Sequence, residues 1–102
     1  MKLHEIAHAR TGDKGDVSNI SVIAFRSEDW PLIRREVTAE RVAAWFGPMV
    51  TGEVRRYELP QLQALNFVLA GALAGGVTRS LALDAHGKCL GSVLLGLEIA
   101  DH

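Results

Sequence analysis

Three stretches of the chain have the hydrophobic and polar pattern of β-strands. Residues 53–59 alternate strictly between two sets of side chains, and Pro60 ends the run. Residues 17–25 are rich in β-branched side chains and contain no glycine or proline. Residues 3–9 form a short run without breaking residues. We therefore predict strands over these three stretches.

Two helices are predicted between the second and third strands. The first begins at Asp29-Trp30-Pro31, because an acidic residue ahead of a first-turn proline is typical of a helix start. Thr38 is predicted to cap the second helix, which ends at Gly47-Pro48. Both helices carry one apolar side and one charged side, so each should pack against a sheet.

Residues 62–73 are apolar at nearly every position, which we interpret as a helix covered on more than one face. Such a helix in a small domain predicts a second covering element or another subunit. Asn66 lies in its middle and needs a partner, because an unpaired buried amide costs about 1–3 kcal/mol. That partner is a backbone group, the glycine-containing segment described below, or a ligand.

The remaining sequence predicts a closing hairpin. Gly71, Gly75 and Gly76 are interpreted as a helix C-cap followed by a tight return. Residues 77–84 and 89–99 then have the pattern of two strands around a glycine-containing turn. Residues 1–102 are thus predicted to be a single α+β domain, a sandwich of about five mainly antiparallel strands with helices on one face. The order of the strands stays open.

Composition limits the classes of partner. The formal charge is −1 at pH 7, from 11 basic and 12 acidic residues, which predicts neither nucleic acid nor an anionic membrane as a partner. Apolar residues make up 48% of a 102-residue chain, and such a small domain buries only about two thirds of its surface. We therefore expect a homo-oligomer, most simply a dimer.

Cellular location is predicted from cysteine usage and from the apolar segments. The single Cys89 excludes an intramolecular disulfide and fits a reducing compartment. We expect no secretory signal and no membrane span, so the predicted location is the cytoplasm.

The strongest candidate site is the polar segment from Arg10 to Asn19, which we predict to be a loop between the first two strands. Gly12 and Gly15 adopt positive φ at little cost and would turn backbone N–H groups toward one centre. Cations and carboxylates alternate along the segment, in the order Arg10, Asp13, Lys14 and Asp16.

This charge order suits two arrangements of the segment. One is a self-compensated ion network, and the other is a Mg²⁺-assisted phosphate site with Asp13 and Asp16 as metal ligands. No other cofactor is expected. The spacing is not that of a Walker loop. The candidate ligand- or partner-binding residues are Arg10, Thr11, Gly12, Asp13, Lys14, Gly15, Asp16, Asn19 and Asn66.

Other polar residues do not form a recognisable catalytic set. His8 lies near the segment and has an acid–base interpretation as well as a packing one. Arg56 has the alternatives of an anion anchor and a cross-strand ion pair. Ser18, Ser80 and Cys89 lack an evident base, so the sequence leaves open whether the protein is an enzyme.

Nearly the whole chain resembles a known family. The matching segments are Arg10-Thr11-Gly12-Asp13-Lys14-Gly15-Asp16, Asn19-Ile20, Arg56-Tyr57-Glu58-Leu59-Pro60, Ala64-Leu65-Asn66-Phe67-Val68-Leu69, Gly75-Gly76-Val77-Thr78-Arg79-Ser80-Leu81, and Asp84 with Gly87-Lys88. They resemble the C-terminal domain of the acyclic terpene utilisation protein A (AtuA) family. The resemblance implies a ferredoxin-like α+β fold, and a domain that occurs either fused to a large domain or as a separate short protein.

The resemblance also implies a metabolic setting, the bacterial catabolism of acyclic terpenoids as acyl-CoA thioesters. The sequence does not include the family's large N-terminal domain. We therefore expect an accessory or small-subunit module that assembles as a homo-oligomer or with a separately encoded large AtuA-type protein. The alternative is a small enzyme or binding domain that acts on a carboxylated or CoA-thioester substrate through the segment from Arg10 to Asn19.

Overall fold

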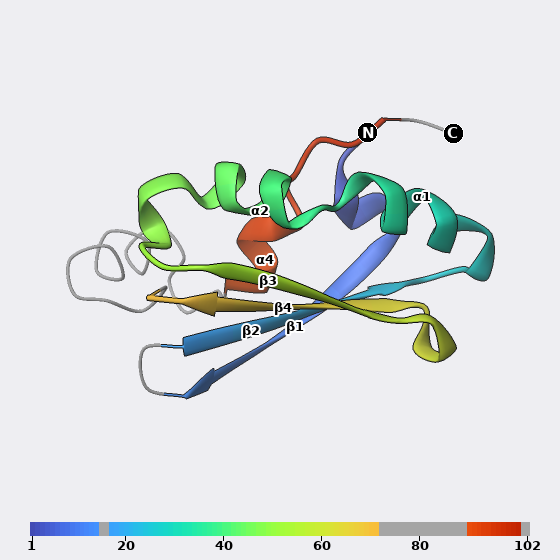
Figure 1. The fold of residues 1–102 in the computed structure, drawn as a ribbon. Helices are drawn as coiled ribbons and strands as arrows, with labels where there is room; N and C mark the ends of the chain where they lie inside the picture. The colour runs from blue at the N-terminus through green and yellow to red at the C-terminus, as the bar shows by residue number, and fades with distance from the viewer. Residues whose placement is uncertain (15–16, 72–89, 101–102) are drawn as a thin grey trace.

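The protein has two layers, an antiparallel sheet and a layer of helices over one of its faces (Figure 1). The computed structural model describes residues 1–14, 17–71 and 90–100. The strands are β1 (Ala7–Lys14), β2 (Val17–Ala24), β3 (Val54–Leu59) and β4 (Ala64–Ala70). The helices are α1 (Trp30–Glu36), α2 (Ala39–Phe46) and α4 (Leu90–Leu94), with short 3-10 turns at Leu3–Glu5, Ser27–Asp29, Gly47–Met49 and Pro60–Leu62.

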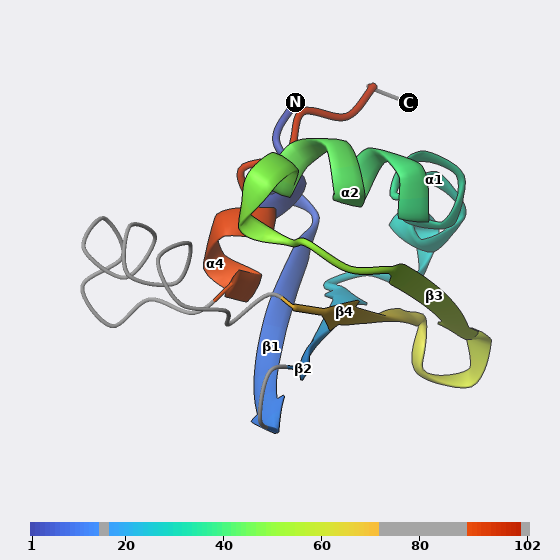
Figure 2. The same cartoon turned by 60° about the vertical axis from the view of Figure 1, so that its left-hand side comes forward.

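The sheet has the strand order β1-β2-β4-β3, and every neighbouring pair is antiparallel. β2 and β4 are therefore central, and β1 and β3 are the edges. Figure 2 shows α4 above β1, while α1 and α2 cover the rest of the same face. The opposite face of the sheet carries no helix in the described part of the chain.

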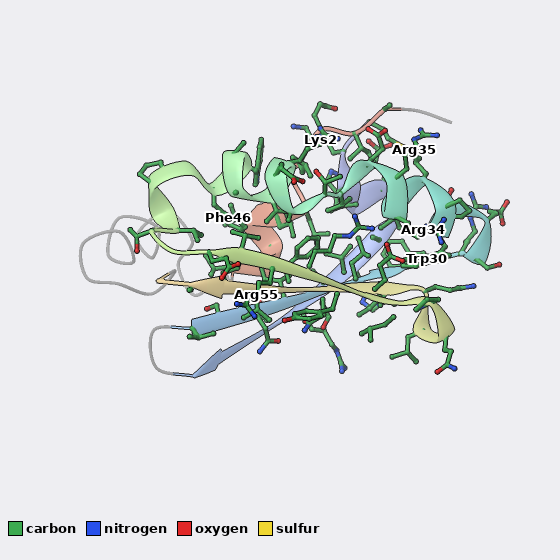
Figure 3. All side chains as sticks on the ribbon, in the orientation of Figure 1. Lys2, Trp30, Arg34, Arg35, Phe46 and Arg55 are labelled. Carbon is green, nitrogen blue, oxygen red and sulfur yellow. The ribbon has the colours of Figure 1, made fainter. Side chains whose placement is uncertain are left out.

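The hydrophobic core lies between the two layers. Alternate residues of the central strands face the helices, and in these strands Ile20, Val22, Leu65, Phe67 and Leu69 are fully buried. The helices contribute a matching set of buried side chains, Leu32, Ile33, Val42 and Phe46, with Val37 from the residue after α1. Figure 3 shows Phe46 between α2 and the sheet.

Four of the predicted elements are confirmed. β2 and β3 lie where strands were predicted, and α1 and α2 form the predicted pair of helices. The side chain of Thr38 caps α2, because its Oγ1 accepts a hydrogen bond from the backbone N of Arg41 at 3.1 Å. Gly47 ends α2 with a φ of 55°, a conformation that favours glycine.

The prediction of a helix over residues 62–73 is wrong, because residues 64–70 form the central strand β4. The stretch is apolar almost throughout because a central strand is covered on both edges and on its core face. The helices cover Leu65, Phe67 and Leu69, whereas Asn66 and Val68 are half-buried on the other face. Gln63 reverses the chain into β4 with a left-handed φ of 53°.

The two ends of the chain also differ from the prediction. Residues 3–5 form a 3-10 turn, and the first strand begins only at Ala7. Residues 90–94 form α4 instead of a strand. The segment after α4 runs beside the N-terminal residues, where Leu3 N donates to Leu97 O and His4 N donates to Leu95 O, both at 2.9 Å.

The described residues thus form four strands instead of about five. The argument for another subunit from a helix that is apolar all round no longer holds, because residues 64–70 form a strand. The homo-oligomer itself stays a prediction. Several predictions fall outside the described residues. These are the conformations of Gly15, Asp16, Gly75 and Gly76, the strand over residues 77–84 and its turn, and the chemistry of Ser80 and Cys89.

Candidate functional site

The segment from Arg10 to Asn19 is a β-hairpin, so the prediction of a polar loop is wrong for its described part. Residues 10–14 belong to β1 and residues 17–19 to β2, and the ladder continues to the pair Lys14↔Val17. Gly12 pairs with Asn19 inside this ladder. Its φ is not positive, because Gly47 and Gly71 are the described glycines with that conformation. An anion-binding nest at Gly12 is therefore excluded.

The metal hypothesis stays a prediction. It rests on Asp13 and Asp16, and the side chain of Asp13 and all of Asp16 lie outside the described part of the molecule. The side chain of Lys14 is not described either. Among the described residues, no group of three or more His, Cys, Asp and Glu side chains is arranged to hold a metal ion.

Thr11 lies on the core face of β1 and has a structural contact. Its Oγ1 accepts a hydrogen bond from the backbone N of Gly91 at 2.8 Å. A Cβ on Gly91 would lie 2.7 Å from that same Oγ1 and 3.1 Å from the Cβ of Ala9. Thr11 therefore holds the first turn of α4 against β1, at a separation that only glycine permits.

Arg10 and Asn66, two of the predicted site residues, lie in one row on the opposite face of the sheet. We call this side of the sheet, which points away from the helices, the open face. Strand register places Arg10 opposite Ser21, Ser21 opposite Asn66, and Asn66 opposite Tyr57. These four residues form the polar row, which crosses all four strands from edge to edge. It joins residues that are up to 56 positions apart in sequence.

The interior of the polar row is hydrogen-bonded. Ser21 Oγ donates to Asn66 Oδ1 at 3.2 Å, between neighbouring positions of β2 and β4. This bond gives Asn66 the partner that the sequence required, although the residue lies on a strand. Asn66 and Ser21 are half-buried, whereas Arg10 and Tyr57 at the two ends are exposed.

Exposed apolar side chains lie at one end of the open face, beside the polar row. The next row of the sheet is His8, Ile23, Ala64 and Leu59. The His8 ring stacks on Phe25 with a centroid separation of 5.3 Å. Phe25 remains 59% exposed and Leu59 38%, and Leu62 in the turn before β4 is 67% exposed. We call His8, Phe25, Leu59 and Leu62 the apolar end.

The described cations of the open face are Arg10 and Arg55. In the described part of the chain, the Arg10 guanidinium has no carboxylate within ion-pair distance. Arg55 extends from the sheet on the side away from the helices (Figure 3). The Tyr57 side chain and Glu53 raise the pKa of Arg55, and Glu53 Oε1 lies 3.1 Å from the Arg55 Nε. Exposure to solvent keeps the Arg55–Glu53 pair weak.

Arg56 and Trp45 lie on the helical side and have packing roles. Arg56 Nη2 donates to the carbonyl O of Arg34 at 2.7 Å and to Glu58 at 3.0 Å, which ties α1 to the edge strand β3. The predicted cross-strand ion pair is thus an ion pair within one strand. Trp45 Nε1 donates to Val93 O at 2.9 Å beside a shallow hollow of about 250 Å³.

Sequence reasoning missed Ser21 and Tyr57. Alternation within residues 53–59 already placed Tyr57 on the side opposite Arg56. The open face could not be predicted from the sequence, because residues 64–70 have the pattern of a helix. Without β4 as a strand, its pairing with β2 has no basis in the sequence.

Comparison with known proteins identifies the family. No helix in the described residues has the length and apolar character needed to span a membrane. Neither the curated proteins nor the solved structures gave a match to this chain. A family model, the AtuA ferredoxin-like domain, matches residues 1–100. The antiparallel sheet with helices on one face agrees with the α+β, ferredoxin-like fold that the sequence predicted. The chain therefore belongs to the AtuA ferredoxin-like domain family.

Proposed function

We propose that the chain is an accessory assembly module of bacterial acyclic terpenoid and acyl-CoA catabolism, and that it acts in the cytoplasm. The single observation that carries this proposal is the open face. It combines the polar row with several exposed apolar side chains on a hydrogen-bonded sheet. Large apolar side chains gathered on an exposed surface, with polar groups beside them, are typical of a protein–protein contact site.

The hydrogen bonds and the burial of residues on the open face favour a role in protein binding rather than a role in catalysis. Its central amide and hydroxyl are bonded to each other, and its exposed groups are Arg10, Tyr57 and the apolar end. The hollow that accompanies Trp45 lies on the helical side, away from the polar row. Assembly with a second copy of the chain or with a separately encoded large AtuA-type protein uses this face.

Growth experiments test the proposed role. We expect deletion of the gene to slow growth of its source organism on an acyclic terpenoid but not on acetate. Complementation with the wild-type chain should restore growth, and complementation with Tyr57→Ala should restore it only partly. The control variant Arg34→Ala changes an exposed residue of α1 and should restore growth fully. Normal growth of the deletion strain on the terpenoid would contradict the role.

A second candidate function is binding of a carboxylated or CoA-thioester ligand at the hairpin. The observation that favours it is Arg10, an exposed cation next to Asn19 and Ser21 on one face. A guanidinium in this position suits a carboxylate or phosphate oxygen. This function predicts that a CoA thioester raises the melting temperature and that Arg10→Ala removes the shift.

A further inference from the structure

The open face is complementary to itself when one particular two-fold axis relates two copies. Consider an axis that lies between two stacked open faces, parallel to the strands and above the boundary between β2 and β4. This axis places β1 of one copy over β3 of the other, and β2 over β4. Each row of the sheet then meets the same row of the partner in reverse order.

This reversal pairs unlike groups along the polar row. Arg10 at the β1 edge meets Tyr57 of the second copy at the β3 edge, and the contact occurs twice. A guanidinium over a phenol ring is a favourable cation–π arrangement. Ser21 meets Asn66 of the second copy, and each has a remaining donor or acceptor for the other.

When the same axis relates the two copies, the neighbouring rows of their sheets make an apolar contact. His8 and its stacked Phe25 on the β1 side meet Leu59 of the second copy on the β3 side, next to Leu62. Phe25, Leu59 and Leu62 are among the exposed large apolar side chains of the described residues. Covering them removes apolar area from water, which is the main favourable contribution to association.

The charge of Arg10 favours this axis over a second two-fold axis that would also stack the two open faces. An axis along the polar row would leave β1 over β1, so that Arg10 would meet Arg10 of the second copy. Two desolvated guanidinium groups in contact repel, and no described carboxylate lies close enough to neutralise them. The whole molecules do not oppose association, because each carries a formal charge of only −1.

We propose that a second copy of this chain occupies the open face, with Arg10 of each copy packed on Tyr57 of the other. The proposal rests on the proposed function, because it names the partner of that docking face. A small tilt of the axis away from the strand direction gives the rotation that is typical of aligned sheet packing and keeps the central rows in contact.

The size of the face sets the strength of the dimer. Four strands spaced about 4.8 Å apart, with roughly seven residues each at about 3.3 Å per residue, cover roughly 450 Å² per copy in projection. Two copies together bury about 900 Å², below the roughly 1,200 Å² at the low end of stable interfaces. The dimer should therefore exchange with monomer and have a Kd in the micromolar range.

Sedimentation velocity on the purified chain over a wide concentration range tests the proposal. We expect the average mass to rise from 11.1 kDa toward twice that value as concentration increases. Arg10→Glu should weaken the dimer at least tenfold. Arg34→Glu makes the same change of charge on α1 and should leave the Kd unchanged. Circular dichroism checks that each variant is folded.

Tyr57→Glu distinguishes a contact across the interface from a contact within one chain. Within one chain, Arg10 and residue 57 lie at opposite edges of the sheet, about 14 Å apart. A glutamate at position 57 therefore reaches an Arg10 only across the interface. We expect Tyr57→Glu to retain a dimer that becomes sensitive to salt, whereas Tyr57→Glu combined with Arg10→Glu should be monomeric.

The outcomes separate this inference from the proposed function. A chain that stays monomeric at every concentration overturns the second copy as partner, and so does a dimer that Arg10→Glu leaves intact. If the chain is monomeric but binds a large AtuA-type protein through the same face, the inference fails and the proposed function stands. If the dimer forms but the deletion strain grows normally on the terpenoid, the proposed function fails.

Discussion

At the scale of single residues, the contact between Gly91 and Thr11 fixes how closely α4 approaches the sheet. A methyl group on Gly91 would lie 2.7 Å from Thr11 Oγ1, a distance that real Cβ atoms do not tolerate. We expect Gly91→Ala to lower the free energy of unfolding by about 1–3 kcal/mol, because α4 must move away from β1. Urea denaturation measures this change.

Gly96→Ala is the matched control for Gly91→Ala. Both glycines lie in or just after α4, but a Cβ on Gly96 meets its nearest atoms at 3.4 Å, which is close to ordinary contact. The control variant should change stability by less than about 0.5 kcal/mol. Equal stability of the two alanine variants would contradict the close packing of α4 on β1.

The bond between Ser21 and Asn66 gives a second prediction at this scale. The two side chains lie on neighbouring strands at a donor–acceptor distance of 3.2 Å and are half-buried. We expect a double-mutant cycle of Ser21→Ala and Asn66→Ala to give a coupling energy of about 0.5–1.5 kcal/mol. The cycle is measured below the concentration at which dimers form. A coupling energy near zero would show that the bond does not stabilise the monomer.

At the scale of elements, local signals predicted the helical pair and two of the strands. Pro31, Thr38 and Gly47 act within one turn of the chain, so α1 and α2 were predictable without any knowledge of the fold. β4 was not predictable in this way. Its leucines and alanines favour a helix, and only hydrogen bonds to β2 and β3 on both sides make it a strand.

The candidate site was predictable only in part, for the same reason. The sequence singled out Arg10 and Asn66, but the loop conformation expected around Arg10 was wrong. The polar row exists only because the strand register aligns one residue from each of the four strands. Long-range register of this kind depends on the packing of both layers and has no short sequence signal.

The C-terminal segment gives a prediction at the element scale. Glu36 at the end of α1 accepts a hydrogen bond from Ala100 N at 3.3 Å, and Arg41 Nη1 lies 3.1 Å from its carboxylate. Arg41 Nη2 also donates to the Glu98 carbonyl. The Ala100 N–H, then Arg35, with a smaller contribution from Arg41, hold the pKa of Glu36 below its ordinary value of 4.5.

A lowered pKa fixes the direction of the pH dependence. The contribution of Glu36 to stability is present above pH 4.5 and is lost as the pH falls through its lower folded-state pKa. Glu36→Gln should therefore show a smaller loss of melting temperature between neutral and acidic pH than the wild type. Glu40→Gln, which alters an exposed carboxylate of α2 without a described ion pair, is the control. Identical acid profiles for Glu36→Gln and the wild type would contradict this role of Glu36.

At the scale of the whole molecule, one helical layer covers one face of the sheet, and the described residues leave the other face without a helix over it. The described residues thus give a small core on one side and a surface of mixed character on the other. If a second copy binds the folded chain, as we propose, association stabilises the fold by mass action. The melting temperature of the chain should then depend on its own concentration.

We expect the melting temperature to rise by roughly 3–5 °C for each tenfold increase in concentration above the Kd, as follows from the unfolding entropy of a domain of this size. Arg10→Glu should show this rise only at concentrations at least tenfold higher. A CoA thioester, with or without Mg²⁺, should leave the wild-type value unchanged if the face binds protein. A shift caused by the thioester and abolished by Arg10→Ala, with no dependence on protein concentration, would instead favour the ligand-binding function, because only a small ligand stabilises a monomer independently of other copies.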